Sequence, residues 1–320
     1  MVNNNTPHLK ISPIANLSSL ASILSLNLSD LIHLADNAEN YWRRGKLLKK
    51  KSGEPRPTHD AKDPLKTIHQ RINNRILKQV QYPYFVMGGI SDKLQPRTCK
   101  AHASLHSGKS VLISEDIKDF YPSSKCEVVH EIWQYCFNFS HDVSKVLTAL
   151  TTYQGSIPQG WKTSSYLANL VFWDKEPDLV TLFESRGYVY SRYMDDITVS
   201  SKRKISDQDK FFVISEIYKM LSSKGFSPKR SKHEISYKNI PMKVTNLGVN
   251  GSRPTISRRD RKNIRAMVYE LEGCVGVGGN SEEFLKQWRV VSGKVSHLIS
   301  IHPKEGEILR RRLRVLIKRK

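Results

Sequence analysis

The 320-residue sequence has few of the features that stabilise secreted proteins or anchor membrane proteins. It contains only four cysteines, none of them in the CxxC spacing of a zinc or redox site: Cys99, Cys126, Cys136 and Cys274. The apolar stretch over residues 17–34 is interrupted by serines, Asn27, Asp30 and His33, and is too polar for a transmembrane helix. No basic leader with a cleavage site precedes it. These absences argue against a zinc site and a disulfide framework, and predict a cytoplasmic protein with buried thiols and no membrane partner.

Acidic residues are also scarce beside basic ones. The chain has 30 Asp+Glu against 52 Lys+Arg, a formal net charge of +22. Such an excess favours a polyanionic partner, of which nucleic acid is the leading candidate. An anionic membrane surface and a merely solubilising charge are the alternatives, but no basic amphipathic helix stands alone as an anchor, and solubility requires only a few net charges. The excess is densest at the end of the chain, where residues 257–320 hold 16 Lys+Arg against 7 Asp+Glu.

The apolar periodicity alternates between helix and strand along the chain, which predicts an α+β fold. No internal repeat or low-complexity linker interrupts it. The expected elements are two short helices within 17–41, a helix over 63–80, a strand from 110 to 116, helices over 126–139 and 141–153, a hairpin over 188–200, a helix over 209–226 and a strand pair over 243–251. Basic helices follow from residue 257, and the glycine-rich segment 273–283 is expected to be a connector between them.

Two adjacent carboxylates, Asp195 and Asp196, lie in "YMDD" at the expected tip of the hairpin. Asp is common in turns, so turn chemistry is one interpretation. A divalent cation is the other, since Mg²⁺ prefers carboxylate and phosphate oxygens. A third acid, Asp116, ends the apolar strand before "IKDFYPS". If these strands lie side by side, Asp116 and Asp195 could hold two Mg²⁺ ions about 4 Å apart, as phosphoryl transfer requires.

The order of the surrounding motifs resembles that of reverse transcriptases over roughly residues 45–250. "DIKDFYPS", "IPQGWKTSSYLANL", "YMDD", "KGFSPKRSKHEI" and "LGVN" are similar to the successive polymerase motifs of that family. "GEPRP" followed by "LKTIHQRI" resembles the segment that contacts the incoming triphosphate. The resemblance implies a right-hand polymerase whose palm has an α+β (α/β) fold.

Two further segments resemble markers of the bacterial retron reverse transcriptases. "HASLH" stands where these proteins carry Asn-Ala-x-x-His, with His102 in place of the Asn and with His106 matching. "VTN" stands where they carry Val-Thr-Gly, with Asn246 in place of the Gly. The resemblance implies His106 as a nucleic-acid-binding residue, with a core or loop histidine as the alternative interpretation. The two departures leave the retron subtype open.

The resemblance also implies roles for individual residues. Asp116, Asp195 and Asp196 would be the catalytic metal ligands for two Mg²⁺ ions. Around the nucleotide, Lys49 and Arg56 would clamp phosphate oxygens, Tyr121 would lie under the sugar and exclude a 2′-hydroxyl, Gln159 and Gly160 would border the substrate, and Lys232 would protonate pyrophosphate. The adjacent Lys50 and Lys51 leave the lysine position open. In the tail, the arginines expected to follow a nucleic-acid backbone are Arg310, Arg311, Arg312 and Arg314.

These assignments divide the chain into N-terminal helices and fingers (1–110), a palm (111–250) with a fingers-like helical insertion at about 123–157, and a basic helical thumb (251–320). The expected partners are dNTPs, a cognate structured non-coding RNA, its DNA product and a separate effector protein. The implied activity starts from a 2′-hydroxyl of a guanosine and gives branched multicopy single-stranded DNA, in defence against phage. The alternatives are a group II intron-like or diversity-generating reverse transcriptase and a non-catalytic RNA-binding scaffold.

Overall fold

The computed structural model describes residues 5–45, 47–49, 53, 55–92, 94–278 and 282–318. The chain forms two compact units. The first unit combines Met1–Thr98 with Leu112–Ile235, and the second combines Cys99–Val111 with Ser236–Lys320. The predicted division into fingers, palm and thumb stays a prediction, because compactness alone does not assign these functional names.

A five-stranded sheet with strand order β11-β8-β10-β9-β7 lies mostly in the first unit. Its strands are β7 (Val86–Met87), β8 (Val111–Asp116), β9 (Tyr188–Tyr193), β10 (Asp196–Ser201) and β11 (Glu234–Tyr237). Strands β9 and β10 are antiparallel and form the predicted hairpin, and β7 runs parallel to β9. The aromatic and β-branched residues of the hairpin suit such a sheet.

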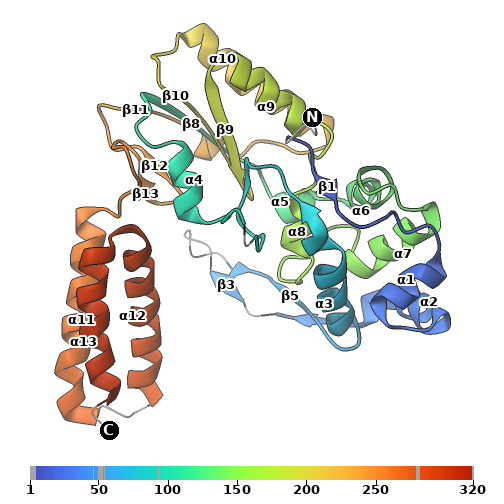
Figure 1. Ribbon diagram of the computed structural model, residues 1–320, viewed down its shortest axis with the longest axis horizontal. Coiled ribbons are helices and arrows are strands. Elements are labelled where there is room, and N and C mark those ends of the chain that lie inside the picture. Colours follow the sequence, from blue (N-terminus) through green and yellow to red (C-terminus); the bar gives the residue numbers. More distant parts are fainter. Residues whose placement is uncertain are drawn as a thin grey trace. The chain divides into compact units, whose positions relative to one another are not determined.

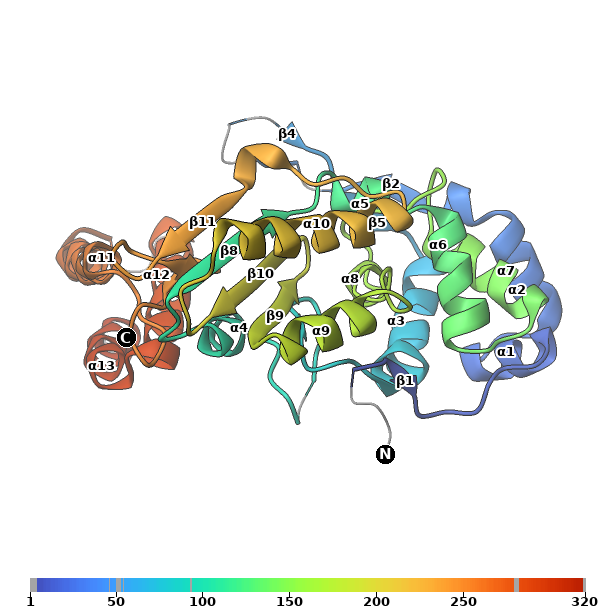
Figure 2. The ribbon, with the colours of Figure 1, turned by 90° about the horizontal axis from the view of Figure 1, so that it is seen from above.

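Two helices run beside the sheet of the first unit (Figure 2). Helix α9 (Glu176–Ser185) packs against β9, and α10 (Asp207–Ser223) packs against α9. Helix α10 begins with a capping box in which Ser206 and Asp209 bond each other's backbone N–H groups. Residues Ile197–Ser201 of β10 are all buried, so this part of the strand is covered on both faces.

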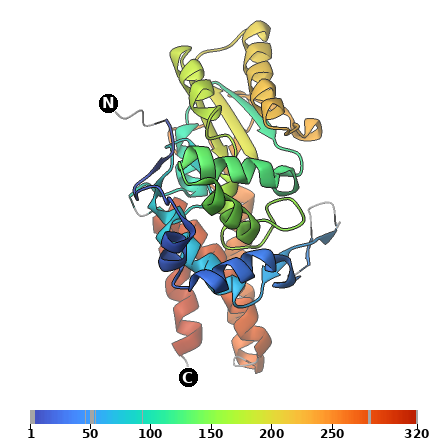
Figure 3. The same ribbon diagram turned by 90° about the vertical axis from the view of Figure 1, so that its right-hand side faces the viewer.

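A second layer of the first unit is helical (Figures 1 and 3). It contains α1 (Leu17–Leu24), α2 (Leu28–Asp36), α3 (Leu65–Arg75), α6 (Cys126–Glu131) and α7 (His141–Thr151). Helix α7 contacts the other four. The predicted pair of short helices over 17–41 is confirmed, whereas the helix expected over 63–80 ends at Arg75, followed by a 3-10 turn and β6.

Short elements connect these layers. They are β1 (His8–Leu9), η1 (Ala38–Asn40), β2 (Trp42–Arg44), β3 (Leu48–Lys49), β4 (Pro55–Arg56), β5 (His59–Ala61), η2 (Leu77–Gln79), β6 (Val80–Gln81), α5 (Phe120–Ser123), η3 (Ile132–Cys136), α8 (Ser164–Ala168) and η4 (Arg230–Lys232). Two-stranded pairs join β1 to β6, β2 to β5 and β3 to β4.

Within the described residues, no single helix combines the length and the apolar content needed to cross a membrane. Helices α1 and α2 reach that length and apolarity only as a pair, and they meet at an angle of 91°.

The second unit contains three long helices that pack side by side (Figure 1). They are α11 (Arg258–Gly278), α12 (Glu282–Ile301) and α13 (Pro303–Lys318). A smaller part consists of α4 (Cys99–Leu105) against the predicted strand pair, β12 (Lys243–Val244) and β13 (Leu247–Gly248). The expected connector over 273–283 is shorter than predicted, because α11 continues through its glycines to Gly278.

Candidate active site

Strand β8 delivers Asp116 to the site from a buried position. Every residue of β8 except Ser114 is buried, and Asp116 retains only 3% of its surface exposed. The residue that follows β8, Ile117, bonds to the hairpin: its N–H donates to the Asp195 carbonyl at 2.9 Å. The end of β8 is therefore tied directly to the hairpin tip, and this confirms that the two strand ends lie next to each other.

The hairpin tip that carries the other two acids is a two-residue loop. Asp196 pairs with Tyr193 in the ladder, so Met194 and Asp195 form the loop. Met194 has a positive φ of 58°, an uncommon conformation for a residue other than glycine. The tip is thus a defined, strained turn and not a flexible end.

The three carboxyl groups interact electrostatically. Burial, followed by the charges of Asp195 and Asp116, raises the pKa of Asp196 to about 6, and a hydrogen bond with Asp116 acts in the same direction. Asp196 nevertheless keeps an exposed surface, so the site is open to solvent on that side. Like charges held this close need a cation to remain ionised together.

Lys232 supplies one such positive charge. Its ammonium group forms an ion pair with Asp116. Partial burial lowers the pKa of Lys232, but the hydrogen bond with Asp116 and the charges of the three aspartates outweigh this and raise it. The next residue, His233, has its Nδ1 2.5 Å from Oε1 of Glu115. Lys232 and His233 thus bind Asp116 and Glu115, the last two residues of β8.

These acids fit a divalent ion whose coordination is completed by substrate. Among the described residues, no group of three or more His, Cys, Asp or Glu side chains is placed to hold a metal ion. Mg²⁺ is usually bound by one or two carboxylates together with waters and substrate phosphates, and does not require a full protein cage. Besides burial, the charges of Asp195 and Asp116 raise the pKa of Asp196, and Lys232 pairs with Asp116. A divalent ion would neutralise the remaining negative charge of the cluster.

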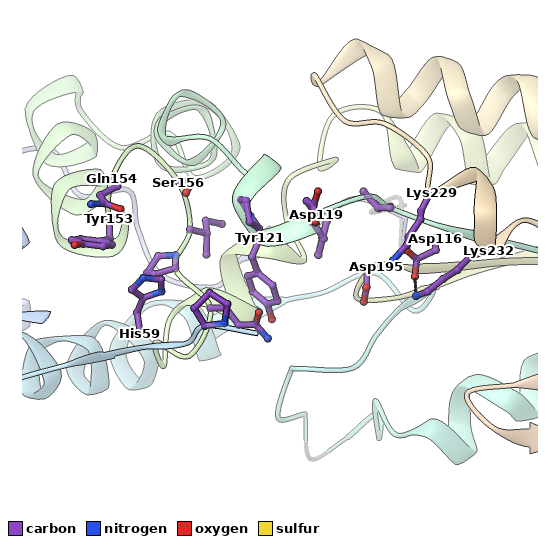
Figure 4. Close-up of a pocket in the computed structure, with 17 residues that line it drawn as sticks. His59, Asp116, Asp119, Tyr121, Tyr153, Gln154, Ser156, Asp195, Lys229 and Lys232 are labelled. Carbon is purple, nitrogen blue, oxygen red and sulfur yellow. Dashed lines mark hydrogen bonds and ion pairs between the residues drawn. The ribbon is translucent and has the colours of Figure 1, made fainter. Parts of the chain in front are cut away.

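A cavity of about 750 Å³ opens from this cluster (Figure 4). Asp116, Asp195, Lys229 and Lys232 lie together at one end of it. Tyr121 lies between that end and a second group formed by His59, Tyr153 and Gln154. Gln159 also lines the cavity. The structure therefore brings Tyr121, Gln159 and Lys232 into one space with two of the three aspartates.

Gly160 is next to this cavity but has a close protein neighbour. Its φ is +117°, and a Cβ atom there would lie 2.4 Å from the His59 carbonyl oxygen. The His59 N–H also donates to the Gln159 carbonyl at 2.8 Å. The sequence predicted that Gly160 lets the backbone approach a nucleotide, but in the structure the backbone of β5 lies close to it. A contact of Gly160 with substrate stays a prediction.

The site can now be compared with known proteins. Residues 48–251 match the family model described as reverse transcriptase (RNA-dependent DNA polymerase). The retron Se72 reverse transcriptase of Salmonella heidelberg (strain 579083-10) is 31% identical over 297 residues, which span 92% of this chain and 77% of that protein. The chain belongs to the bacterial retron reverse transcriptases. It is also 27% identical over 315 residues to the retron Ec48 reverse transcriptase of Escherichia coli, covering 95% of this chain and 77% of that protein.

Membership of the family makes this retron reverse transcriptase an RNA-directed DNA polymerase with a right-hand fold. The family uses divalent metal ions, in agreement with the charge of the aspartate cluster. Among solved structures, telomerase from Candida albicans in complex with a fragment of telomeric RNA has a TM-score of 0.37 and 12% identity, covering 62% of this chain and 40% of that one. A likeness of that size adds nothing to the assignment.

The two basic residues predicted to clamp phosphates lie in the β3–β4 ribbon. Leu48 pairs with Arg56, and Lys49 with Pro55, in an antiparallel ladder. The side chains of Lys49 and Arg56 lie outside the described part of the structure, as do Lys50 and Lys51 entirely. Their contacts with phosphate stay predictions.

In the second unit, His106 follows α4 and is fully buried, at 0% exposure. Burial lowers its pKa well below the ordinary value, with the nearby charges of His102 and Lys109 acting in the same direction. A buried neutral imidazole presents no surface to RNA, so the structure does not support the predicted direct contact. The side chain packs edge-on against His102, with ring centroids 5.6 Å apart, and this favours a packing role.

The four arginines predicted to bind nucleic acid on α13 have different surroundings. Arg312 bonds Glu272 through two nitrogens, at 2.8 and 2.6 Å, and Arg310 pairs with Glu307. Arg311 and Arg314 are exposed. Of these four arginines, only Arg311 and Arg314 form no ion pair with a carboxylate within the described residues.

Sequence reasoning missed a second basic face, on α11. Arg258, Lys262, Arg265 and Tyr269 are all exposed, and Tyr269 keeps 73% of its surface accessible. Their spacing of four, three and four residues places them on one side of the helix. That spacing is present in the sequence, but at a lower density of arginine than in the run on α13.

Proposed function

We propose that this retron reverse transcriptase transfers deoxynucleotides at the aspartate end of the cavity, with two Mg²⁺ ions held by Asp116, Asp195 and Asp196. The observation that carries the proposal is the shared space: Asp116, Asp195, Lys232 and Tyr121 line one cavity, and the third carboxyl interacts with the other two. Bound divalent ions would neutralise the triphosphate and activate the attacking hydroxyl.

The neighbouring side chains would hold the rest of the nucleotide. Lys232 lies at the acid end of the cavity, where it can bind the triphosphate and donate a proton to the departing pyrophosphate. The ring of Tyr121 lies farther along the same cavity, where a sugar bearing a 2′-hydroxyl would meet it. Gln159 would border the base, and Lys49 and Arg56 would clamp phosphate oxygens from the β3–β4 ribbon.

A matched pair of variants tests the metal assignment. Asp195→Asn should reduce dNTP incorporation on an RNA template at least about a thousandfold, because the charge that stabilises the transition state is lost. Asp119 is the control, since it lines the same cavity but belongs to none of the interactions of the cluster. Its φ of 46° suits Asn equally well, so Asp119→Asn should retain activity. Near-normal activity of Asp195→Asn would refute the proposal.

We further propose that the enzyme copies its own structured non-coding RNA, starting from a 2′-hydroxyl of a guanosine, and makes branched multicopy single-stranded DNA. The similarity to retron enzymes and the strong positive charge support this. An internal 2′-hydroxyl of RNA lies in a wide, accessible minor groove. The product should then keep a short ribonucleotide stub after RNase treatment, and a debranching enzyme should remove it. DNA with a free 5′ end before debranching would contradict this priming mode and would indicate another class of reverse transcriptase.

The proposed biological role is defence against phage in the cytoplasm, together with a separate effector protein. A cell carrying the native locus should resist phage, and the same locus with Asp195→Asn should not. If the variant protects equally well, DNA synthesis is not required, and the protein acts as an RNA-binding scaffold.

A further inference from the structure

A buried arginine lies directly beneath the hairpin tip of the first unit. Arg192 of β9 has 0% of its surface exposed. Its Nε and Nη2 donate to the two carboxylate oxygens of Glu176, at 2.7 and 2.8 Å. Tyr190 donates to the same carboxylate at 2.7 Å. A buried charge is tolerated only when it is paired and fully hydrogen-bonded, so this network is a built arrangement and not an incidental contact.

Further hydrogen bonds of Arg192 reach the turn and the end of α8. Nη1 donates to the Met194 carbonyl at 3.1 Å, and Nη2 donates to the Asn169 carbonyl at 3.0 Å. The planar guanidinium therefore joins the carboxylate of α9 to the carbonyl that immediately precedes Asp195. A lysine could supply the charge, but it could not donate several hydrogen bonds in the fixed planar arrangement of a guanidinium group.

Met194 needs such support because its backbone is strained. Its φ of 58° is unfavourable for a side chain with a Cβ. Its N–H donates to the Met87 carbonyl at 3.2 Å, and its Sδ lies 3.4 Å from Asn169 Nδ2. Gly89 leaves the room for this sulfur, since a Cβ at that position would lie 2.7 Å from it. Two segments that are distant in sequence, around residues 87–89 and at Asn169, thus hold Met194 in place.

We infer that Arg192 is a positioning residue that sets the orientation of Asp195 for metal binding, acting through the Met194 carbonyl. The Met194–Asp195 peptide is held by Arg192 on one side, and the Asp195 carbonyl is held by the Ile117 N–H on the other. Loss of either hold would allow the turn to relax toward an unstrained conformation and would rotate the Asp195 carboxylate. This inference rests on the proposed role of Asp195 as a metal ligand.

The test compares Arg192→Lys with Lys224→Met in the full chain bound to its RNA. Lys224 is also a nearly buried cation of the first unit, paired with Glu131 and Asp174, but it has no recorded bond to the hairpin. Two readouts are needed: the Mn²⁺ concentration for half-maximal single-nucleotide incorporation, and amide hydrogen exchange of the peptide 193–198. Thermal unfolding of both variants measures the loss of stability that a purely structural role would produce.

Arg192→Lys should raise the half-maximal Mn²⁺ concentration about tenfold or more, the range seen when residues behind metal ligands are changed. Exchange of the 193–198 amides should increase with it. Lys224→Met should lose stability but keep both readouts at the wild-type value. If Arg192→Lys does not fold, Glu176→Gln is the second variant, because it keeps the shape of the side chain that binds Arg192. It should raise the half-maximal Mn²⁺ concentration and the 193–198 amide exchange by smaller amounts.

Wild-type metal dependence and hairpin exchange in Arg192→Lys would overturn the inference, as would equal changes in Lys224→Met. The outcome is separable from that of the metal proposal. If Asp195→Asn remains active, the metal assignment itself fails. If Asp195→Asn is inactive while Arg192→Lys responds normally to Mn²⁺, only the positioning role fails.

Discussion

The two units of this retron reverse transcriptase differ in the ion pairs that they bury. The first unit contains a fully buried pair, since the side chains of Arg192 and Glu176 are 0% and 3% exposed. In the second unit, ion pairs lie at the surface, as in Arg312 with Glu272, at 40% and 29%. Buried pairs specify geometry, because their desolvation is compensated only in one arrangement. Surface pairs add little stability and leave the excess positive charge available to a polyanion.

The sharpest test of this contrast removes one charge from the first unit. Asp116→Asn should reduce nucleotide incorporation at least about a thousandfold at saturating RNA, since it removes a predicted metal ligand. Filter binding should show RNA affinity within a few-fold of wild type, because a single carboxylate contributes little to the field of a protein with net charge +22. A loss of RNA affinity as large as the loss of rate would break the contrast between the units.

A second test concerns the close packing of the first unit. Gly160→Ala should lower the free energy of unfolding by about 3 kcal/mol, because the new Cβ overlaps the His59 carbonyl at a positive φ. Gly155→Ala is the control, with a φ of +71° and nothing within 4 Å of the added atom, and should cost about 1 kcal/mol. Urea denaturation measures both values. Equal losses would mean that the His59 backbone can move away.

The units should also differ in their response to acid. Burial lowers the pKa of His69 in the first unit and of His102 in the second from 6.5 to about 4. The neutral form is favoured in the folded state, so full stability is present above pH 6.5 and is lost as the pH falls toward 4, by about 2 kcal/mol per histidine at pH 5. Burial lowers the pKa of His106 in the second unit as well.

The second unit has two fully buried histidines, His102 and His106, and the first has one, His69. The second unit should therefore lose more stability between pH 7.5 and 5 than the first. Amide hydrogen exchange, corrected for its intrinsic pH dependence, resolves the two units in the full chain. Greater opening of the first unit at pH 5 would show that other groups dominate its acid response.

The smallest effect is expected on α13. Arg311→Gln with Arg314→Gln should flatten the slope of log affinity against log salt by about 1.4–1.8, if each contacts one phosphate. The matched pair, Arg310→Gln with Arg312→Gln, should change the slope less, because Glu307 and Glu272 already engage these side chains. Equal slopes for the two pairs would show that exposure does not select the nucleic-acid contacts.

Much of this architecture followed from local sequence patterns. The alternation of "YVYSRYMDDITVS" predicted the hairpin, and the apolar run before Asp116 predicted the strand that meets it. The connector prediction for the glycine-rich segment was wrong in its first part, because α11 continues to Gly278 despite the poor helix propensity of glycine. The sequence alone could not decide between a core histidine and a nucleic-acid contact at His106, since a single histidine has no periodic partner that would reveal its surroundings.

The sequence by itself determined the family, the excess of positive charge and the three aspartates, because these depend on residue type and order alone. Only the tertiary structure decided which residues surround them. Arg192 reads as an ordinary strand residue next to the motif, and Glu176 as a helix start, yet together they hold the turn before Asp195. A contact between residues 16 positions apart depends on the packing of α9 on β9, which is a property of the whole fold and not of any local pattern.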